Sequence, residues 1–278
     1  AIYLRAYYSG GYHSMNLELK NITIIGGGTQ LYMYVPIRVY ITECNFSNPS
    51  GSGHLIDAYY GYYVDIHNNT FNSPGMNIYL DRTYYVDFTR NSGTIQYFYQ
   101  NRYRYSDISN NTFNARNFYL YSGYFSDFQG NILNGTSSSQ NLCYLNDCNR
   151  IKIANNTFIG GNDAIYVQHP NAYDPVRNGY ESWSSLTFEY NIFNGSGGRG
   201  IYFHWATNHP SIAYMDIHHN RFIGCSDYAI ELNSGGSPTS MVYRNIFMYN
   251  HGSGESYSGL SQQARDGWSQ FRWSKNNV

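Results

Sequence analysis

We predict an all-β fold, a single right-handed parallel β-helix (solenoid) of about ten coils, from three features of the 278-residue sequence. A short phrase recurs, and its clearest copies are residues 64–71 (Val-Asp-Ile-His-Asn-Asn-Thr-Phe) and 106–113 (Ser-Asp-Ile-Ser-Asn-Asn-Thr-Phe). Ten copies lie about 25 residues apart, which is the period of a repeat fold. Gly and Asn clusters separate the copies, as turns require.

A second phrase of the form apolar-Tyr-apolar precedes most copies, as at residues 78–80 and 118–120. In six consecutive copies, 15 residues separate its start from the apolar residue that closes the coil. Both phrases alternate apolar and polar residues, which predicts short strands with one buried face. Such a unit cannot bury that face alone, but stacked coils cover one another. We therefore place the β-helix at residues 1–250 and assign residues 251–278, where the repeat ends, to a C-terminal cap or tail.

Composition excludes several classes of function. The chain has 17 basic and 18 acidic residues, so it lacks the excess of Lys and Arg with which proteins bind nucleic acid. No apolar run approaches the roughly 20 residues of a membrane span. Asn134 and Asn194 lie in Gly/Ser segments and match the Asn-x-Ser/Thr pattern, so they are the expected glycosylation sites of an exported protein. We expect an extracellular location or a cell or virion surface.

The recurring Ile-x-Asn-Asn-x-Phe and Gly-Ile-Tyr-Phe phrases resemble the parallel β-helix repeat proteins of the pectate-lyase-like superfamily. The resemblance covers roughly residues 1–250 and implies the fold. It leaves the function open, because that superfamily includes polysaccharide lyases, polygalacturonases, epimerases, phage tail spikes and adhesins. Residues 161–165 and 198–201 are similar to polygalacturonase motifs, but Asn162 and Arg199 replace two key positions, which disfavours that activity.

The phrase with the central Tyr predicts a row of outward-facing residues, one per coil. The row reads Tyr3, Tyr32, Asp57, Tyr79, Tyr99, Tyr119, Tyr144, Tyr166, Tyr202 and Glu231. One interpretation is a self-stacking ladder that stabilises the sheet. The other is an aromatic strip that contacts glycans or another subunit, with Trp183 and Trp205 as further contact residues.

Four consecutive coils carry a carboxylate at one position, namely Asp65, Asp87, Asp107 and Asp127. Like charges about 5 Å apart repel unless something neutralises them, so bound calcium is one explanation. The other is that each Asp opens a turn. The sequence requires no cofactor otherwise. The four cysteines are expected to be buried thiols, and only Cys143 and Cys148 are close enough in the chain to form a disulfide.

The second Asn of the recurring phrase, as in Asn69, Asn111 and Asn156, is expected to form an internal ladder of amides. His218 and His219 are adjacent, so on a strand they are expected to point to opposite faces and not to share a metal ion.

The largest insertions lie in the eighth and ninth coils, after Gln168 and after His204, and both leave the same sheet. We expect a site beside them. His204 and Glu231 are candidate acid–base residues on adjacent coils, and Arg177 is a candidate for holding a substrate carboxylate.

These features support two hypotheses. The favoured one is a structural, fibre, spike or adhesin-like surface β-helix that contacts glycans or neighbouring subunits through its Tyr-rich face. The strand expected at Ile2 also suggests that another copy or another domain covers the N-terminal end. The alternative is a polysaccharide lyase, hydrolase or epimerase that acts at the loops of coils eight and nine. The sequence leaves open whether the protein is an enzyme.

Overall fold

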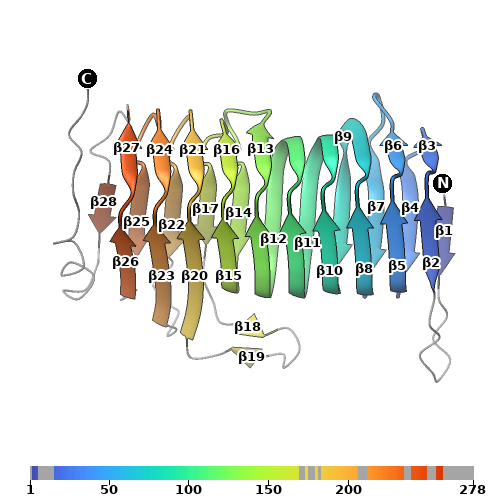
Figure 1. Ribbon diagram of the computed structural model, residues 1–278, viewed down its shortest axis with the longest axis horizontal. Helices are drawn as coiled ribbons and strands as arrows, with labels where there is room; N and C mark the ends of the chain where they lie inside the picture. Colours follow the sequence, from blue (N-terminus) through green and yellow to red (C-terminus); the bar gives the residue numbers. More distant parts are fainter. Residues whose placement is uncertain are drawn as a thin grey trace.

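The structure is a computed structural model that describes residues 2–5, 16–168, 173–174, 179–180, 183–205, 212–234, 239–248 and 255–258. These residues form strands and turns without a helix, so none of them forms a helix that could cross a membrane. Parallel strands stack into one β-solenoid of about nine turns, whose coils follow one another along the long axis (Figure 1). The predicted parallel β-helix is therefore confirmed, with about nine turns where the sequence suggested about ten.

The strands fall into three columns, and each strand pairs with its equivalents in the coils before and after. The first column contains β1 (Ile2–Arg5), β4 (Thr29–Tyr34), β7 (Gly53–Tyr59), β14 (Cys143–Asn146), β17 (Ile165–Gln168), β22 (Ile201–Trp205), β25 (Ile230–Ser234) and β28 (Glu255–Ser258). The second contains β2 (Leu17–Lys20), β5 (Ile37–Thr42), β8 (Tyr62–His67), β10 (Tyr84–Thr89), β15 (Asn149–Ala154), β20 (Trp183–Glu189), β23 (Ile212–His218) and β26 (Thr239–Tyr243). The third contains β3 (Thr23–Ile25), β6 (Asn45–Ser47), β13 (Ile132–Gly135), β16 (Thr157–Ile159), β21 (Ile192–Asn194), β24 (Arg221–Ile223) and β27 (Ile246–Met248).

Three long strands in the middle of the solenoid run through more than one column. They are β9 (Thr70–Asp81), β11 (Ser92–Ser109) and β12 (Thr112–Gln129). β18 (Tyr173–Asp174) and β19 (Gly179–Tyr180) form a separate antiparallel pair inside the eighth-coil insertion. β28 lies in the segment expected to be a cap, and it pairs in parallel with β25 as one more rung of the first column.

The core is a stack of apolar rows inside the solenoid, and the closing Phe of the recurring phrase forms one of them. Neighbouring rings in this row lie nearly parallel, with centroids 5.2 Å apart between Phe158 and Phe193 and 4.6 Å apart between Phe193 and Phe222. Gly93 interrupts the row. Its φ is +135°, and a Cβ there would lie 1.8 Å from the Phe71 carbonyl oxygen, so only glycine fits.

The predicted internal amide ladder is present and longer than the sequence indicated. It runs through Asn69, Asn91, Asn111, Asn131, Asn156, Asn191, Asn220 and Asn245. At Asn91, for example, the backbone N–H donates to the Asn111 Oδ1 at 2.9 Å, and the side-chain amide donates to the same oxygen at 3.2 Å and to the Ile66 carbonyl at 2.8 Å. Each rung therefore satisfies buried polar groups of its neighbours.

The residue before each ladder Asn turns the chain and takes a left-handed backbone conformation. Asn68, Asn110 and Asn155 have φ of 56° to 57° at this position, and Gly130 has φ of 65°. Asn and Gly are the residues that adopt this conformation most easily. The Asn-Asn pair of the phrase thus serves two needs: the first Asn makes the turn and the second makes the ladder.

Candidate functional site

The predicted row of outward tyrosines is one continuous row of the first column. Register pairs join Tyr3, Tyr32, Asp57, Tyr79, Tyr99, Tyr119, Tyr144, Tyr166, Tyr202 and Glu231 in succession. A second outward row, two residues further along each strand, contains Tyr34, Tyr59, Asp81, Asn101, Tyr121, Asn146, Gln168 and His204. We call these two rows the tyrosine face. Its described tyrosines are mostly half-buried, because they cover one another.

Rings of the tyrosine face stack along the solenoid and across the two rows. The centroids of Tyr79 and Tyr99 lie 4.7 Å apart with an interplanar angle of 7°, and Tyr144 and Tyr166 lie 5.0 Å apart at 7°. Tyr121 of the second row lies 5.4 Å from Tyr144. These distances match the spacing of about 4.8 Å between neighbouring parallel strands. The self-stacking ladder expected from the sequence is therefore present.

Burial raises the pKa of tyrosine hydroxyls on this face, which are already protonated at neutral pH. Burial, with the Asp81 carboxylate second, raises the pKa of Tyr79 to about 12. Burial, with Tyr166 second, raises the pKa of Tyr144 to about 12. Each phenol can therefore donate as well as accept a hydrogen bond.

Side-chain amides and carboxylates fill the places where the tyrosine face has no Tyr. The Asn101 amide donates to Asp81 at 2.6 Å, and the Tyr144 hydroxyl donates to Gln168. His54 lies 3.1 Å from the Asp57 carboxylate, next to the same face. The polar groups of the face are thus amides, phenols and acids.

An arginine with two acidic partners closes the C-terminal end of the tyrosine face. Arg199 donates to both oxygens of Asp163, at 2.8 and 3.0 Å, and to Glu231 at 2.6 Å. Its guanidinium lies 3.4 Å from the centre of the Tyr202 ring. Burial lowers the pKa of Arg199, but the hydrogen bonds to Asp163 and then Glu231 outweigh it and raise the pKa overall. We call Asp163, Arg199 and Glu231 the acid–arginine cluster.

The structure does not join the two residues expected to act as an acid–base pair. Glu231 pairs in register with Tyr202, whereas His204 pairs with Asn233. The Glu231 carboxylate is bound by Arg199, and the His204 Nδ1 lies 3.1 Å from the Tyr202 hydroxyl. The expected contact fails because the two side chains occupy different rows. The contact of Arg199 with both Asp163 and Glu231 was not predicted from the sequence.

Several predicted site residues lie outside the described part of the chain. Arg177 is one, and the side chains of Trp183 and Trp205 are others, although the backbones of these two belong to β20 and β22. Asn134 and Asn194, the expected glycosylation sites, lie in strands β13 and β21 rather than in loops. Asn194 is exposed, whereas Asn134 is half-buried.

The four predicted carboxylates, Asp65, Asp87, Asp107 and Asp127, form one row in the second column. Burial, with Asp65 and then Asp107 next in size, raises the pKa of Asp87. His67 lies 2.6 Å from Asp65 and supplies one partner. Within the described ranges, no group of three His, Cys, Asp or Glu residues is arranged to hold a metal ion.

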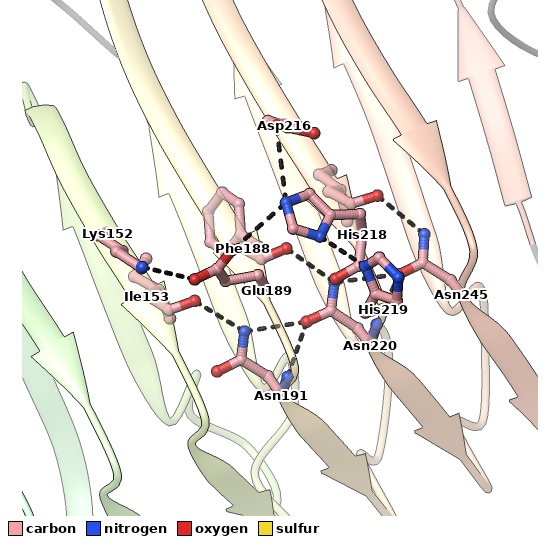
Figure 2. A network of polar contacts seen from close by, with 11 residues as sticks. Lys152, Ile153, Phe188, Glu189, Asn191, Asp216, His218, His219, Asn220 and Asn245 are labelled. Atoms are coloured by element: carbon pink, nitrogen blue, oxygen red, sulfur yellow. Dashed lines mark hydrogen bonds and ion pairs between the residues drawn. The ribbon is translucent and has the colours of Figure 1, made fainter.

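A polar network on the second column connects this outer surface to the Asn ladder (Figure 2). Lys152 lies 2.6 Å from Glu189, and the His218 Nε2 lies 3.4 Å from Glu189 and 3.6 Å from Asp216. The expectation that His218 and His219 point apart is wrong, because their Nδ1 atoms lie 2.8 Å from each other. His219 has left β23 and has a φ of 55°, so strand alternation no longer applies to it.

No family model matches the chain, and comparisons with curated proteins and with solved structures give no match. The resemblance stated from the recurring phrases is therefore supported for the parallel β-solenoid architecture alone.

One surface feature was not predicted from the sequence. Aromatic side chains also project at the corner between the first and second columns, where they form a stack of their own. The signal was available, because a residue pair rich in aromatics recurs in register at residues 62–63, 84–85, 104–105 and 124–125.

Proposed function

We propose that this chain is a surface or extracellular β-solenoid protein that binds an extended, uncharged glycan along its tyrosine face. The observation that carries the proposal is the pair of outward rows in which stacked tyrosines alternate with amides. Sugars bind proteins through aromatic rings and through paired donors and acceptors, and the tyrosine face offers both.

Charge supports an uncharged ligand over an acidic polysaccharide. Asp57, Asp81 and Glu231 are acids inside the two rows. Two arginines that contact the face are already paired, Arg82 with Asp81 at 3.8 Å and Arg199 with Asp163 and Glu231. An anionic chain would meet carboxylates without free cations to offset them. Asn101, Asn146 and Gln168 are neutral hydrogen-bonding groups on the same face.

A repetitive rod suits a fibre, spike or adhesin, because successive coils present similar residues at equivalent positions along the rod. Membership of the pectate-lyase-like superfamily is part of this proposal. Contact with neighbouring subunits is a second use that we propose for the tyrosine face.

Polysaccharide cleavage or epimerisation at coils eight and nine is the second candidate. The observation in its favour is that His204, Tyr202 and the acid–arginine cluster lie together at one end of the tyrosine face. Arg199 already binds both carboxylates, so neither is free to approach a substrate as a general acid. His204 is then the remaining candidate base.

A glycan-array screen tests the proposal, followed by product analysis on each bound polysaccharide. We expect binding without shortened or unsaturated products. Tyr119→Ala in the middle of the face should weaken binding about tenfold, whereas Tyr40→Ala, an exposed tyrosine of the second column, should leave it unchanged. Binding that is insensitive to Tyr119→Ala would count against the tyrosine face. Product formation that is lost in His204→Ala would favour the enzyme instead.

A further inference from the structure

Four aromatic side chains form a ridge where the first column turns into the second. Tyr63, Tyr85, Tyr105 and Phe125 stack in succession, with centroid distances of 4.9, 5.1 and 5.6 Å and interplanar angles of 21°, 19° and 14°. We call them the corner ridge. The three tyrosines are 46%, 37% and 40% exposed, so the corner ridge is more open to solvent than the tyrosine face.

The backbone under the corner ridge is strained. Tyr63, Tyr85, Tyr105 and Phe125 have φ of 58°, 54°, 55° and 50°. Bulky residues in the left-handed region are uncommon and disfavoured, and Asn or Gly would fit more easily. Asn or Gly occupies four of the eight left-handed positions that precede the Asn ladder, whereas the four positions of the corner ridge are all aromatic. Strain of this kind persists where the surrounding structure compensates for it, and here the rings stack on one another.

Charges of opposite sign flank the corner ridge. On the side of the first column lie Arg82 and Arg104, which are half-buried, and Arg102, which is exposed. The Arg104 guanidinium lies 4.8 Å from the centre of the Tyr105 ring. On the side of the second column lie Asp87, Asp107 and Asp127 of the carboxylate row. Within the described residues, these three carboxylates and Arg102 form no ion pair. One Asp107 oxygen is buried without a hydrogen-bond partner.

This arrangement is complementary to a rotated copy of itself. A two-fold axis that runs parallel to the solenoid, in front of the corner ridge, relates the chain to a second, parallel copy. Seen from the first chain, the arginine side and the carboxylate side of the ridge are exchanged in that copy. The arginine side of one copy then faces the carboxylate side of the other, twice and at equal height, because Arg102 and Asp107 belong to the same strand, β11. The antiparallel alternative would place arginines against arginines.

We propose that the corner ridge is the contact surface of a parallel, two-fold symmetric dimer of this chain. The ridge tyrosines and Phe125 form the centre of the contact, and the Arg102–Asp107 pairs form its rim. A glycan is a weaker fit for this surface than for the tyrosine face, because the four ridge residues include no side-chain amide to bind sugar hydroxyls.

Sedimentation-velocity measurements over a range of protein concentrations test the dimer. We expect reversible dimers in the micromolar range that weaken in about 1 M salt, where charges are screened over roughly 3 Å. Replacing Tyr63, Tyr85 and Tyr105 together by Asn keeps residues suited to left-handed backbone, so the fold should be retained while dimerisation weakens at least tenfold. Tyr190→Asn is the matched control, since Tyr190 is 52% exposed with a φ of 56° but lies away from the ridge.

Charge reversal tests the symmetry. Arg102→Glu and Asp107→Arg should each weaken self-association, whereas an equal mixture of the two variants should form a heterodimer, because both rim pairs are then complementary again. Tyr85→Cys should form a disulfide with the Tyr85→Cys of a second chain, and the four native cysteines are buried and do not compete.

Three outcomes would overturn the proposal. They are a wild-type chain that stays monomeric at all concentrations, a dimer unaffected by the triple Asn variant, and variants that do not recover association on mixing. Glycan binding that is lost in the triple Asn variant, without any self-association of the wild-type chain, would assign the ridge to a glycan instead.

Discussion

The Asn ladder and the tyrosine face both repeat once per coil, yet they differ in what the fold demands of them. The Asn ladder is buried, and each amide bonds a backbone group that no water reaches. Tyrosines of the face lie on the outside, where Asp57, Asp81 and Glu231 replace them in the same rows. The ladder accepts no replacement along its described length from Asn69 to Asn245. Inner repeats are therefore fixed by the backbone, whereas outer repeats are open to selection for binding.

Removing the centre of the acid–arginine cluster should have the largest effect on stability. Arg199→Leu leaves Asp163, which is almost fully buried, without a counter-ion, and we expect a loss of about 3 kcal/mol in the free energy of unfolding. Urea denaturation measures it, with Arg221→Leu on an exposed position of β24 as the control. Equal effects of the two variants would show that the cluster is not needed for the fold.

Breaking the Asn ladder should come next. Asn111→Ala removes hydrogen bonds to Phe88, Asn91 and Asn131 and leaves buried partners unsatisfied, at a cost of about 2 kcal/mol. Asn114→Ala, on an exposed position three residues later, should cost less than about 0.5 kcal/mol. If the two variants unfold at the same urea concentration, the distinction between inner and outer repeats is lost.

High pH should act on the tyrosine face and not on the ladder, which does not titrate. The pKa of Tyr79 and that of Tyr144 are each raised to about 12, so folding favours the protonated phenols. The resulting stability is complete below about pH 10, the pKa in the unfolded chain, and is lost as the pH rises toward 12. We expect a loss on the order of 1 kcal/mol per tyrosine, allowing for their partial exposure. Absorbance of tyrosinate, measured with unfolding by circular dichroism, should change in this window. Full ionisation near pH 10 in a folded chain would contradict it.

Truncating one ring of the tyrosine face should cost little stability. Tyr99→Ala removes a stacking partner of Tyr79 and should lower the free energy of unfolding by about 1 kcal/mol. Thermal denaturation measures this, with Tyr40→Ala as the control. A loss as large as that of Asn111→Ala would mean that the outer rows are as much a part of the fold as the ladder.

The carboxylate row should give the smallest change, and one of opposite sign. Folding raises the pKa of Asp87, so its charge destabilises the fold above that pKa, and the penalty falls as the pH is lowered through it. Asp87→Asn should therefore stabilise the chain at pH 7 by about 0.5 kcal/mol, with less effect near pH 3. The measurement is made on dilute protein, so that self-association does not contribute to the measured stability. Destabilisation by Asp87→Asn at pH 7 would indicate that a bound cation or a turn hydrogen bond holds the carboxylate.

The sequence was most informative where spacing alone decides the answer. The distance between phrases predicted the solenoid, the tyrosine row and the carboxylate row. In stacked parallel coils, residues that recur at equal spacing occupy the same position around each coil. It also indicated the Asn ladder at three of its eight described rungs. Asn91, Asn131 and Asn191 were harder to find, since Arg90, Gly130 and Tyr190 replace the preceding Asn of the phrase.

Contacts between neighbouring rows could not be predicted in this way. Arg199 reaches Asp163 in the previous coil and Glu231 in the next, and nothing in the spacing specifies where a long side chain goes. His219 meets His218 because the chain turns at that residue. The corner ridge depends on left-handed backbone at aromatic residues, which sequence preferences argue against.

The four buried thiols have a consequence for how the rod opens. Burial raises the pKa of Cys148 to about 12 and that of Cys225 to about 11, so these thiols react slowly while their coils are closed. Cys44 lies between β5 and β6, Cys143 begins β14, Cys148 directly precedes β15, and Cys225 follows β24. These strands lie near one end, the middle and toward the other end of the described solenoid (Figure 1). A stack in which each coil touches only its neighbours unravels from its ends. The order in which the four thiols become labelled would then record the direction in which the coils come apart.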